Sequence, residues 1–199
     1  MAPTHIAVGL ALATPLAFLA PELASVGALA AIAGSLFPDL DLLVGEHRRS
    51  LHFPAYGWLL AVPAVAVAAI VPTPATLAAA LFLVAAALHP LVDLLGGTSE
   101  PAPWEFATER GVYLHPSRRW LAPTRWVRYD GAPEDLLVAG VLSVPGLLLF
   151  DETVRALTVA SLGVAVAYTA VRKRIPQLSG RFPGAVLWVT SVLLSRLRR

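Results

Sequence analysis

The segment Gly34-Ser35-Leu36-Phe37-Pro38-Asp39-Leu40-Asp41 ends a long apolar run and leads into a polar stretch at residues 46–52, Glu-His-Arg-Arg-Ser-Leu-His. Two aspartates, two histidines and two arginines thus fall within a short part of a chain that otherwise avoids charge. Apolar runs lie on both sides, and a charged side chain near the hydrocarbon core of a membrane costs several kcal/mol. Polar residues in such a place are candidates for a functional site.

The composition indicates an all-α membrane protein. Of the 199 residues, 57% are hydrophobic and 14% are charged, whereas soluble domains carry about 25% charged residues. The length suits one membrane-embedded domain that covers residues 1–199. The absence of cysteine excludes disulfides and thiolate metal ligands. A net charge of +2 gives no reason to expect a nucleic acid as partner.

Six apolar runs predict a polytopic bundle of about six transmembrane helices. They are separated by charged or proline-containing breaks and cover residues 4–20, 23–37, 56–71, 75–95, 136–150 and 154–171. A last apolar piece, residues 184–197, is shorter than the ~20 residues of a perpendicular span, and we expect a short interfacial or re-entrant helix there. The domain then divides into a half that carries the candidate site, a polar cytoplasmic loop and C-terminal helices, at residues 1–95, 96–133 and 134–199.

The distribution of positive charge predicts the orientation. If each run crosses once, the N-terminus and the segments 39–54, 96–133 and 172–183 share one face. Of the 15 lysines and arginines, most lie on this face, namely Arg48, Arg49, Arg110, Arg118, Arg119, Arg125, Arg128, Arg172, Lys173, Arg174 and Arg181. The positive-inside rule therefore places this face in the cytoplasm. The sequence predicts a multi-pass protein of the cell (inner) membrane.

The same alternation brings all five histidines and several aspartates to that face. His89 and Asp93 are four residues apart, so their side chains share one face of a helix. Histidines and carboxylates without cysteine suit a divalent metal, with zinc expected first and manganese or iron as alternatives. The candidate ligands, enough for one or two ions, are His5, Asp39, Asp41, His52, His89 and Asp93.

Each of these residues also has a simpler interpretation. Asp39 could cap the loop, and His5 could lie at the membrane interface. His89 and Asp93 could hydrogen-bond only to each other, and Arg48 could be an ordinary anchor on the inner face. Because the predicted topology places all of these residues on one face, a shared metal site is favoured over the separate simpler interpretations.

Four motifs in order carry a resemblance to a known family. Thr4-His5, residues 34–41, His47-Arg48 with His52, and His89 with Asp93 together resemble the LexA-binding, inner membrane-associated hydrolases. The resemblance covers the N-terminal half, and Leu42, Arg49 and Leu51 depart from the family's pattern. It implies a membrane-bound, metal-dependent hydrolase. The His89–Asp93 pair is also similar to an element of zinc-dependent phospholipases C and P1-type nucleases, which implies phosphoester hydrolysis.

The predicted function is hydrolysis of a phosphoester or lipid-linked substrate at the cytoplasmic membrane surface. A bound metal would activate water, Arg48 would hold the anionic substrate, and His47 or Glu46 would move protons. The expected partners are the lipid bilayer and an anionic substrate. The location of the site at head-group depth suggests that this substrate is lipid-linked.

Two other classes of function remain as alternatives. A non-catalytic, metal-binding membrane scaffold or regulatory protein would have a saturated metal and no adjacent pocket. A metal or proton transporter would carry ionisable residues along the depth of several helices. Here they gather at one end, and the interiors of runs 56–71, 136–150 and 154–171 carry essentially none. The scaffold is therefore the stronger alternative.

Overall fold

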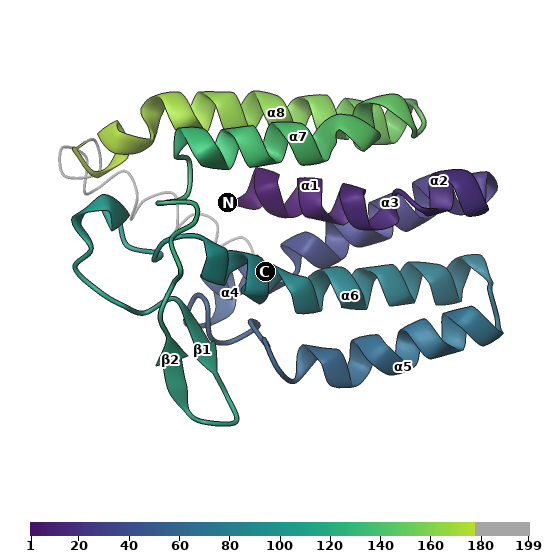
Figure 1. Cartoon of the computed structure of the whole chain (residues 1–199), viewed down its shortest axis with the longest axis horizontal. Helices are drawn as coiled ribbons and strands as arrows, with labels where there is room; N and C mark the ends of the chain where they lie inside the picture. Colours follow the sequence, from purple (N-terminus) through teal and green to yellow (C-terminus); the bar gives the residue numbers. More distant parts are fainter. Residues whose placement is uncertain (178–199) are drawn as a thin grey trace, which may run out of the picture.

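The computed structural model describes residues 1–177, and all six predicted runs are helical (Figure 1). The first run forms two helices and each other run forms one: α1 (Ala2–Ala13), α2 (Leu16–Leu19), α3 (Pro21–Leu36), α5 (Gly57–Ile70), α6 (Pro74–Leu95), α7 (Pro133–Leu148) and α8 (Glu152–Val171). The all-α prediction is confirmed. The predicted helix at residues 184–197 lies outside the described residues.

Prolines and caps explain where the helices begin and end. Helices α1, α3, α6 and α7 each have proline in the first two positions, where its missing N–H is not needed and its fixed φ suits the helix. Helix α8 is capped by Asp151, whose carboxylate accepts from the Val154 N–H at 3.0 Å. After α3, Pro38 opens a 3₁₀ turn, η1 (Pro38–Leu40), which continues into the short helix α4 (Asp41–Val44).

Four of the described segments are long and apolar enough to cross a membrane. They are Ala2–Leu19, Pro21–Val44, Pro74–Leu95 and Glu152–Gln177. Helices α5 and α7 have 14 and 16 residues, or about 21 and 24 Å at the α-helical rise, whereas the hydrocarbon core is about 30 Å thick. The six predicted transmembrane helices are thus four candidate spans and two shorter helices.

The helices lie side by side with roughly parallel axes (Figure 1). The α2–α3, α5–α6 and α7–α8 connections lie at one end of the bundle. The N-terminus, α4 and the segment 96–132 lie at the opposite end (Figure 1). Residues from distant parts of the sequence therefore meet at this second end.

The interior of the bundle is built mainly from small residues. One buried cluster comprises Leu10, Ala13, Ala24, Ala28, Ala31, Ala85, Phe150 and Val154. Large apolar side chains such as Leu59, Leu60 and Ile70 are exposed on the outside. Soluble proteins bury their large apolar residues, whereas membrane helices pack through small ones. The packing is therefore that expected of a membrane protein.

Two glycines allow α1, α3 and α6 to approach backbone to backbone. A Cβ on Gly34 would lie 2.1 Å from the Phe82 carbonyl oxygen on α6. A Cβ on Gly9 would lie 2.9 Å from the Ala31 carbonyl oxygen on α3. Neither position has room for a methyl group. These three helices are consequently held close together.

The predicted polar loop contains more structure than expected. It holds a 3₁₀ turn, η2 (Pro103–Glu105), and an antiparallel hairpin of β1 (Val112–Leu114) and β2 (Arg119–Leu121), with Val112 opposite Leu121. Strands of three residues show too little alternation to be predicted from sequence.

This segment, residues 96–132, forms a cap on the end of the bundle. The Thr124 N–H donates to the Leu94 carbonyl at 2.7 Å, and the Tyr113 N–H donates to the Arg48 carbonyl at 3.0 Å. These backbone bonds attach the cap to α6 and to the loop after α4.

Candidate metal centre

Four side-chain atoms from three separate parts of the chain converge under the cap. The His52 Nε2 lies 3.2 Å from Asp93 Oδ2 and 3.9 Å from Asp39 Oδ1. The His89 Nε2 lies 3.4 Å from Asp39 Oδ1 and 3.5 Å from Asp93 Oδ2. Metal–ligand bonds of about 2.0–2.2 Å in a tetrahedral site place neighbouring ligand atoms about 3.3–3.6 Å apart. These four distances are close to the spacing of ligand atoms around one ion, and Asp39, His52 and His89 form a group that could hold an ion.

Three of these atoms are buried and have no hydrogen-bond partner among residues 1–177. They are His52 Nε2, His89 Nε2 and Asp93 Oδ2. A buried polar atom without a partner costs about 1–3 kcal/mol, and a cation between these atoms would remove that cost. The buried histidine and aspartate side chains could thus hold a metal ion.

The local folding of each element explains its contribution. His89 and Asp93 lie one turn apart on α6, and both are buried. Asp39 lies in the 3₁₀ turn that Pro38 begins, at the end of α3. His52 comes from the loop after α4, and α3 is held against α6 at Gly34.

The two histidines are oriented through their other ring nitrogens. His52 Nδ1 lies 2.8 Å from Asp41 Oδ2, and His89 Nδ1 lies 2.5 Å from the Ser35 carbonyl oxygen. In metal sites the non-ligating N–H of a histidine donates to just such a carboxylate or carbonyl, which leaves Nε2 free to bind the metal. Asp41, a predicted ligand, thus lies behind His52 and contacts the imidazole.

The other oxygen of Asp41 holds His47. The Asp41 Oδ1 lies 2.9 Å from His47 Nδ1, and the rings of His47 and His52 meet edge to face. The three residues form a further group of atoms that could hold an ion. One carboxylate therefore fixes two imidazoles.

His5 reaches the centre from the first turn of α1. Its Nε2 lies 3.1 Å from Asp93 Oδ1, and its ring stacks on that of His89 at 3.6 Å between centroids. Its Nδ1 is buried without a hydrogen-bond partner in the described part of the chain. The adjacent Thr4 hydroxyl donates to Asp135 on α7 at 2.5 Å, which fixes this end of α1.

Arg48 balances part of the negative charge. Its backbone is in the left-handed region, with φ of 63°, and its side chain is buried. Nη2 lies 3.4 Å from Asp93 Oδ1, and Nη1 donates to the Gly97 carbonyl of the cap at 2.5 Å. With the histidines neutral, Arg48 and the aspartates Asp39, Asp41 and Asp93 give a formal charge of −2. This charge matches one divalent cation.

Two polar residues from the sequence prediction lie outside the cluster. Glu46 is exposed and pairs with Arg49 at 2.6 Å. His115, the fifth histidine of the face, packs among Phe53 and Tyr113. Its partial burial lowers its pKa below the ordinary value. The structure therefore brings together the six predicted ligands and His47 and Arg48, and it leaves Glu46 at the surface.

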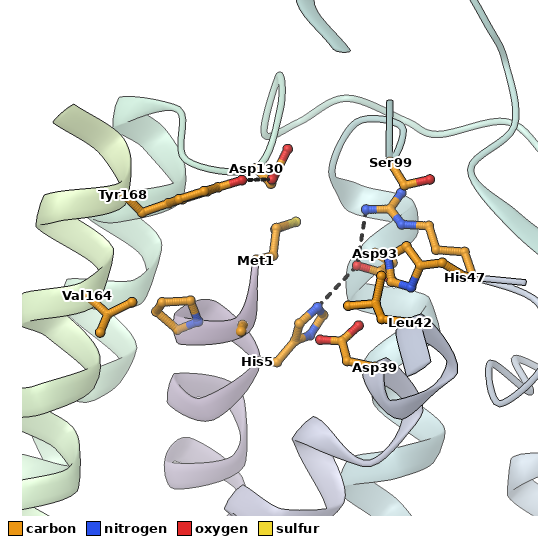
Figure 2. Close-up of a pocket in the computed structure, with 13 residues that line it drawn as sticks. Met1, His5, Asp39, Leu42, His47, Asp93, Ser99, Asp130, Val164 and Tyr168 are labelled. Carbon is orange, nitrogen blue, oxygen red and sulfur yellow. Dashed lines mark hydrogen bonds and ion pairs between the residues drawn. The ribbon is translucent and has the colours of Figure 1, made fainter. Parts of the chain in front are cut away.

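A cavity of about 360 Å³ lies beside the centre (Figure 2). His5, Asp39 and Asp93 lie on one side of it, and Val164 and Tyr168 of α8 lie on the other (Figure 2). The Tyr168 hydroxyl donates to Asp130 of the cap.

Neither Tyr168 nor Asp130 was predicted as a site residue. Tyr168 shares the run 154–171 with other hydroxyl residues such as Thr158 and Ser161. The sequence contains no signal that shows which of them faces the cavity.

Comparison with protein-family models, curated proteins and solved structures finds no match. The function of the centre is therefore inferred from its own residues, their spacing and their surroundings.

Proposed function

We propose that this protein is a membrane-bound, metal-dependent hydrolase of phosphoesters whose centre faces the cytoplasm. One observation carries the proposal: unpartnered histidine and aspartate atoms converge with ligand spacing beside a cavity of about 360 Å³. The cytoplasmic side follows from the positive-inside rule. The resemblance to the LexA-binding, inner membrane-associated hydrolases belongs to the same proposal.

The donor set suits zinc best. His52, His89, Asp39 and Asp93 would hold one ion, and His5, which groups with His89 and Asp93, would contribute to a second. Zinc in such a site supplies Lewis acidity, which polarises a phosphoryl oxygen and makes water more acidic. Manganese and iron accept the same ligands.

The surrounding side chains have separate roles in this proposal. Asp41 holds His47 through Nδ1, so that Nε2 is available to hold or donate a proton at the cavity. Arg48 lines the same cavity, and its positive charge would attract an anionic substrate group, although it already contacts Asp93 and Gly97. Glu46 is too exposed for a comparable role.

Replacement of Asp93 tests the proposal. The wild-type protein, purified in detergent and loaded with zinc, is expected to bind stoichiometric zinc by elemental analysis and to hydrolyse bis(p-nitrophenyl) phosphate. Asp93→Ala removes a ligand atom and should lose both properties. Asp151→Asn is the control, because Asp151 caps α8, and the α7–α8 connection lies at the end of the bundle opposite the centre (Figure 1). Retention of zinc and hydrolysis by Asp93→Ala would rule out this centre.

The number of ligands favours one alternative, a metal-binding scaffold without turnover. Structural zinc sites are closed by four protein ligands, whereas catalytic sites keep one position open. A catalytic site would need one coordination position to be open to water or substrate. Asp39 is the ligand best placed to leave the metal and open such a position, because its side chain is 23% exposed and faces the cavity (Figure 2). Stoichiometric zinc with no hydrolysis of any phosphoester would select the scaffold.

A further inference from the structure

The cavity beside the centre reaches the outer surface of the bundle. Val164 of α8 and Leu42 of α4 both line it, and they are 60% and 65% exposed. Both residues belong to candidate membrane spans, Glu152–Gln177 and Pro21–Val44. The cavity therefore has an apolar opening on the side of the bundle, between α8 and α4.

The position of Val164 along α8 sets the depth of this opening. Helix α8 ends at the basic residues Arg172, Lys173 and Arg174, and both Arg172 and Lys173 lie over the ring of Trp104. Basic and aromatic residues of this kind mark the interface between membrane and water. Val164 is eight residues earlier, or about 12 Å along the helix. The opening thus lies at the level of acyl chains.

A second, polar cavity adjoins the first one. It measures about 490 Å³ and is lined by charged and aromatic residues that include Glu46, Arg110 and Trp120. His47 and Ser99 line both cavities. A molecule in the first cavity therefore has an apolar opening at Val164 and Leu42 and a polar space next to His47 and Ser99.

We propose that the substrate is a membrane phospholipid that reaches the centre sideways, between α8 and α4, and this inference rests on the proposed function. Its phosphodiester lies at Asp39 and Asp93, its acyl chains leave past Val164 and Leu42, and its head group occupies the polar cavity. The oxygen of water bonds to phosphorus, and the phosphorus–oxygen bond to the head group breaks. The head-group oxygen leaves with the proton that the attacking water gives up. The products are phosphatidic acid and the free head-group alcohol.

Bulky substitutions at the opening test this assignment. Vesicles of phosphatidylethanolamine and phosphatidylglycerol serve as the lipid probe, and bis(p-nitrophenyl) phosphate serves as the soluble one. Val164→Trp and Leu42→Trp narrow the opening from its two sides. They should lower the turnover of the lipid probe relative to that of the soluble probe by about tenfold or more, because a lipid whose acyl chains do not fit the opening holds its phosphate out of position. Val166→Trp and Leu43→Trp are matched controls, since these residues are 55% and 64% exposed and do not line the cavity.

The outcomes separate this inference from the function on which it rests. A lowered ratio in both opening variants, with zinc content retained and phosphatidic acid as the lipid product of the wild type, supports the lipid assignment. Hydrolysis of the soluble probe alone, an unchanged ratio, or release of diacylglycerol overturns it and leaves the hydrolase standing. Hydrolysis of neither probe by the zinc-loaded wild type overturns both.

Discussion

Asp41 fixes the orientation of two imidazoles, and its replacement should weaken metal binding without removing a ligand. An asparagine at this position has one oxygen and one N–H₂ group, so it cannot accept from both His47 and His52. We expect Asp41→Asn to lower zinc affinity about 10–100-fold, as measured by competition with a chromogenic chelator. An affinity equal to that of the wild type would show that the ring of His52 is held by packing alone.

At the residue scale, the sequence identified the kinds of residue at the centre better than their roles. His5, His52, His89, Asp39 and Asp93 could be selected because the alternation of the apolar runs brings them to one face, and because a charge such as that of Asp93 in an apolar helix demands a partner. Two aspartates two residues apart after Pro38 can be expected to differ in role, but which of Asp39 and Asp41 faces the cavity could not be predicted. This depends on the 3₁₀ turn after Pro38, which directs one carboxylate to the cavity and the other to two histidines.

At the scale of elements, Gly34 sets the distance between α3 and α6. Gly34→Ala would place a methyl group against the Phe82 carbonyl and should destabilise the fold by about 1–3 kcal/mol. Because α3 carries the turn with Asp39 and α6 carries His89, zinc affinity should fall as well. Thermal unfolding in detergent and zinc titration measure the two effects.

Gly140→Ala is the matched control for this substitution. Gly140 lies inside α7, and a Cβ there would meet nothing within 4 Å in the described structure. The change should be neutral or stabilise by up to about 1 kcal/mol through helix propensity. Equal destabilisation by both substitutions would contradict the close approach of α3 and α6.

The helices themselves could be predicted because apolar composition and proline position act locally. Pro21, Pro74 and Pro133 stand in the first turns of their helices. Whether an apolar helix can span the membrane depends on its length. Helices α5 and α7, with 14 and 16 residues, are too short to be candidate spans. The hairpin in the cap depends on contacts with the bundle, such as the bond from Tyr113 to Arg48, which no local pattern encodes.

For the whole molecule, zinc should be a strong stabiliser, because the centre joins α1, α6, the end of α3 and the loop after α4. At a free zinc concentration 100 times the dissociation constant, binding to the folded state adds about 2.7 kcal/mol. Removal of metal with EDTA should lower the unfolding temperature, and zinc should restore it. Asp93→Ala should show neither change. An unfolding temperature that is independent of zinc would contradict a centre shared by these elements.

The orientation in the membrane can be measured directly because the chain contains no cysteine. Ser117→Cys places a thiol in the hairpin turn of the cap, and Thr153→Cys places one at the opposite end, in the first turn of α8. A membrane-impermeant maleimide added to intact cells should label Thr153→Cys only. Ser117→Cys should react only after permeabilisation. The reverse pattern would place the centre outside the cytoplasm.

The small-residue interior has a consequence for mutational tolerance. In a soluble protein the largest buried side chains are the positions least able to change. Here the outward leucines and valines face the surroundings, and any apolar residue of similar size should serve. The inward alanines are buried, and the glycines at 9 and 34 meet neighbouring backbone. In a saturation mutagenesis screen, the smallest residues of this chain should be the least replaceable.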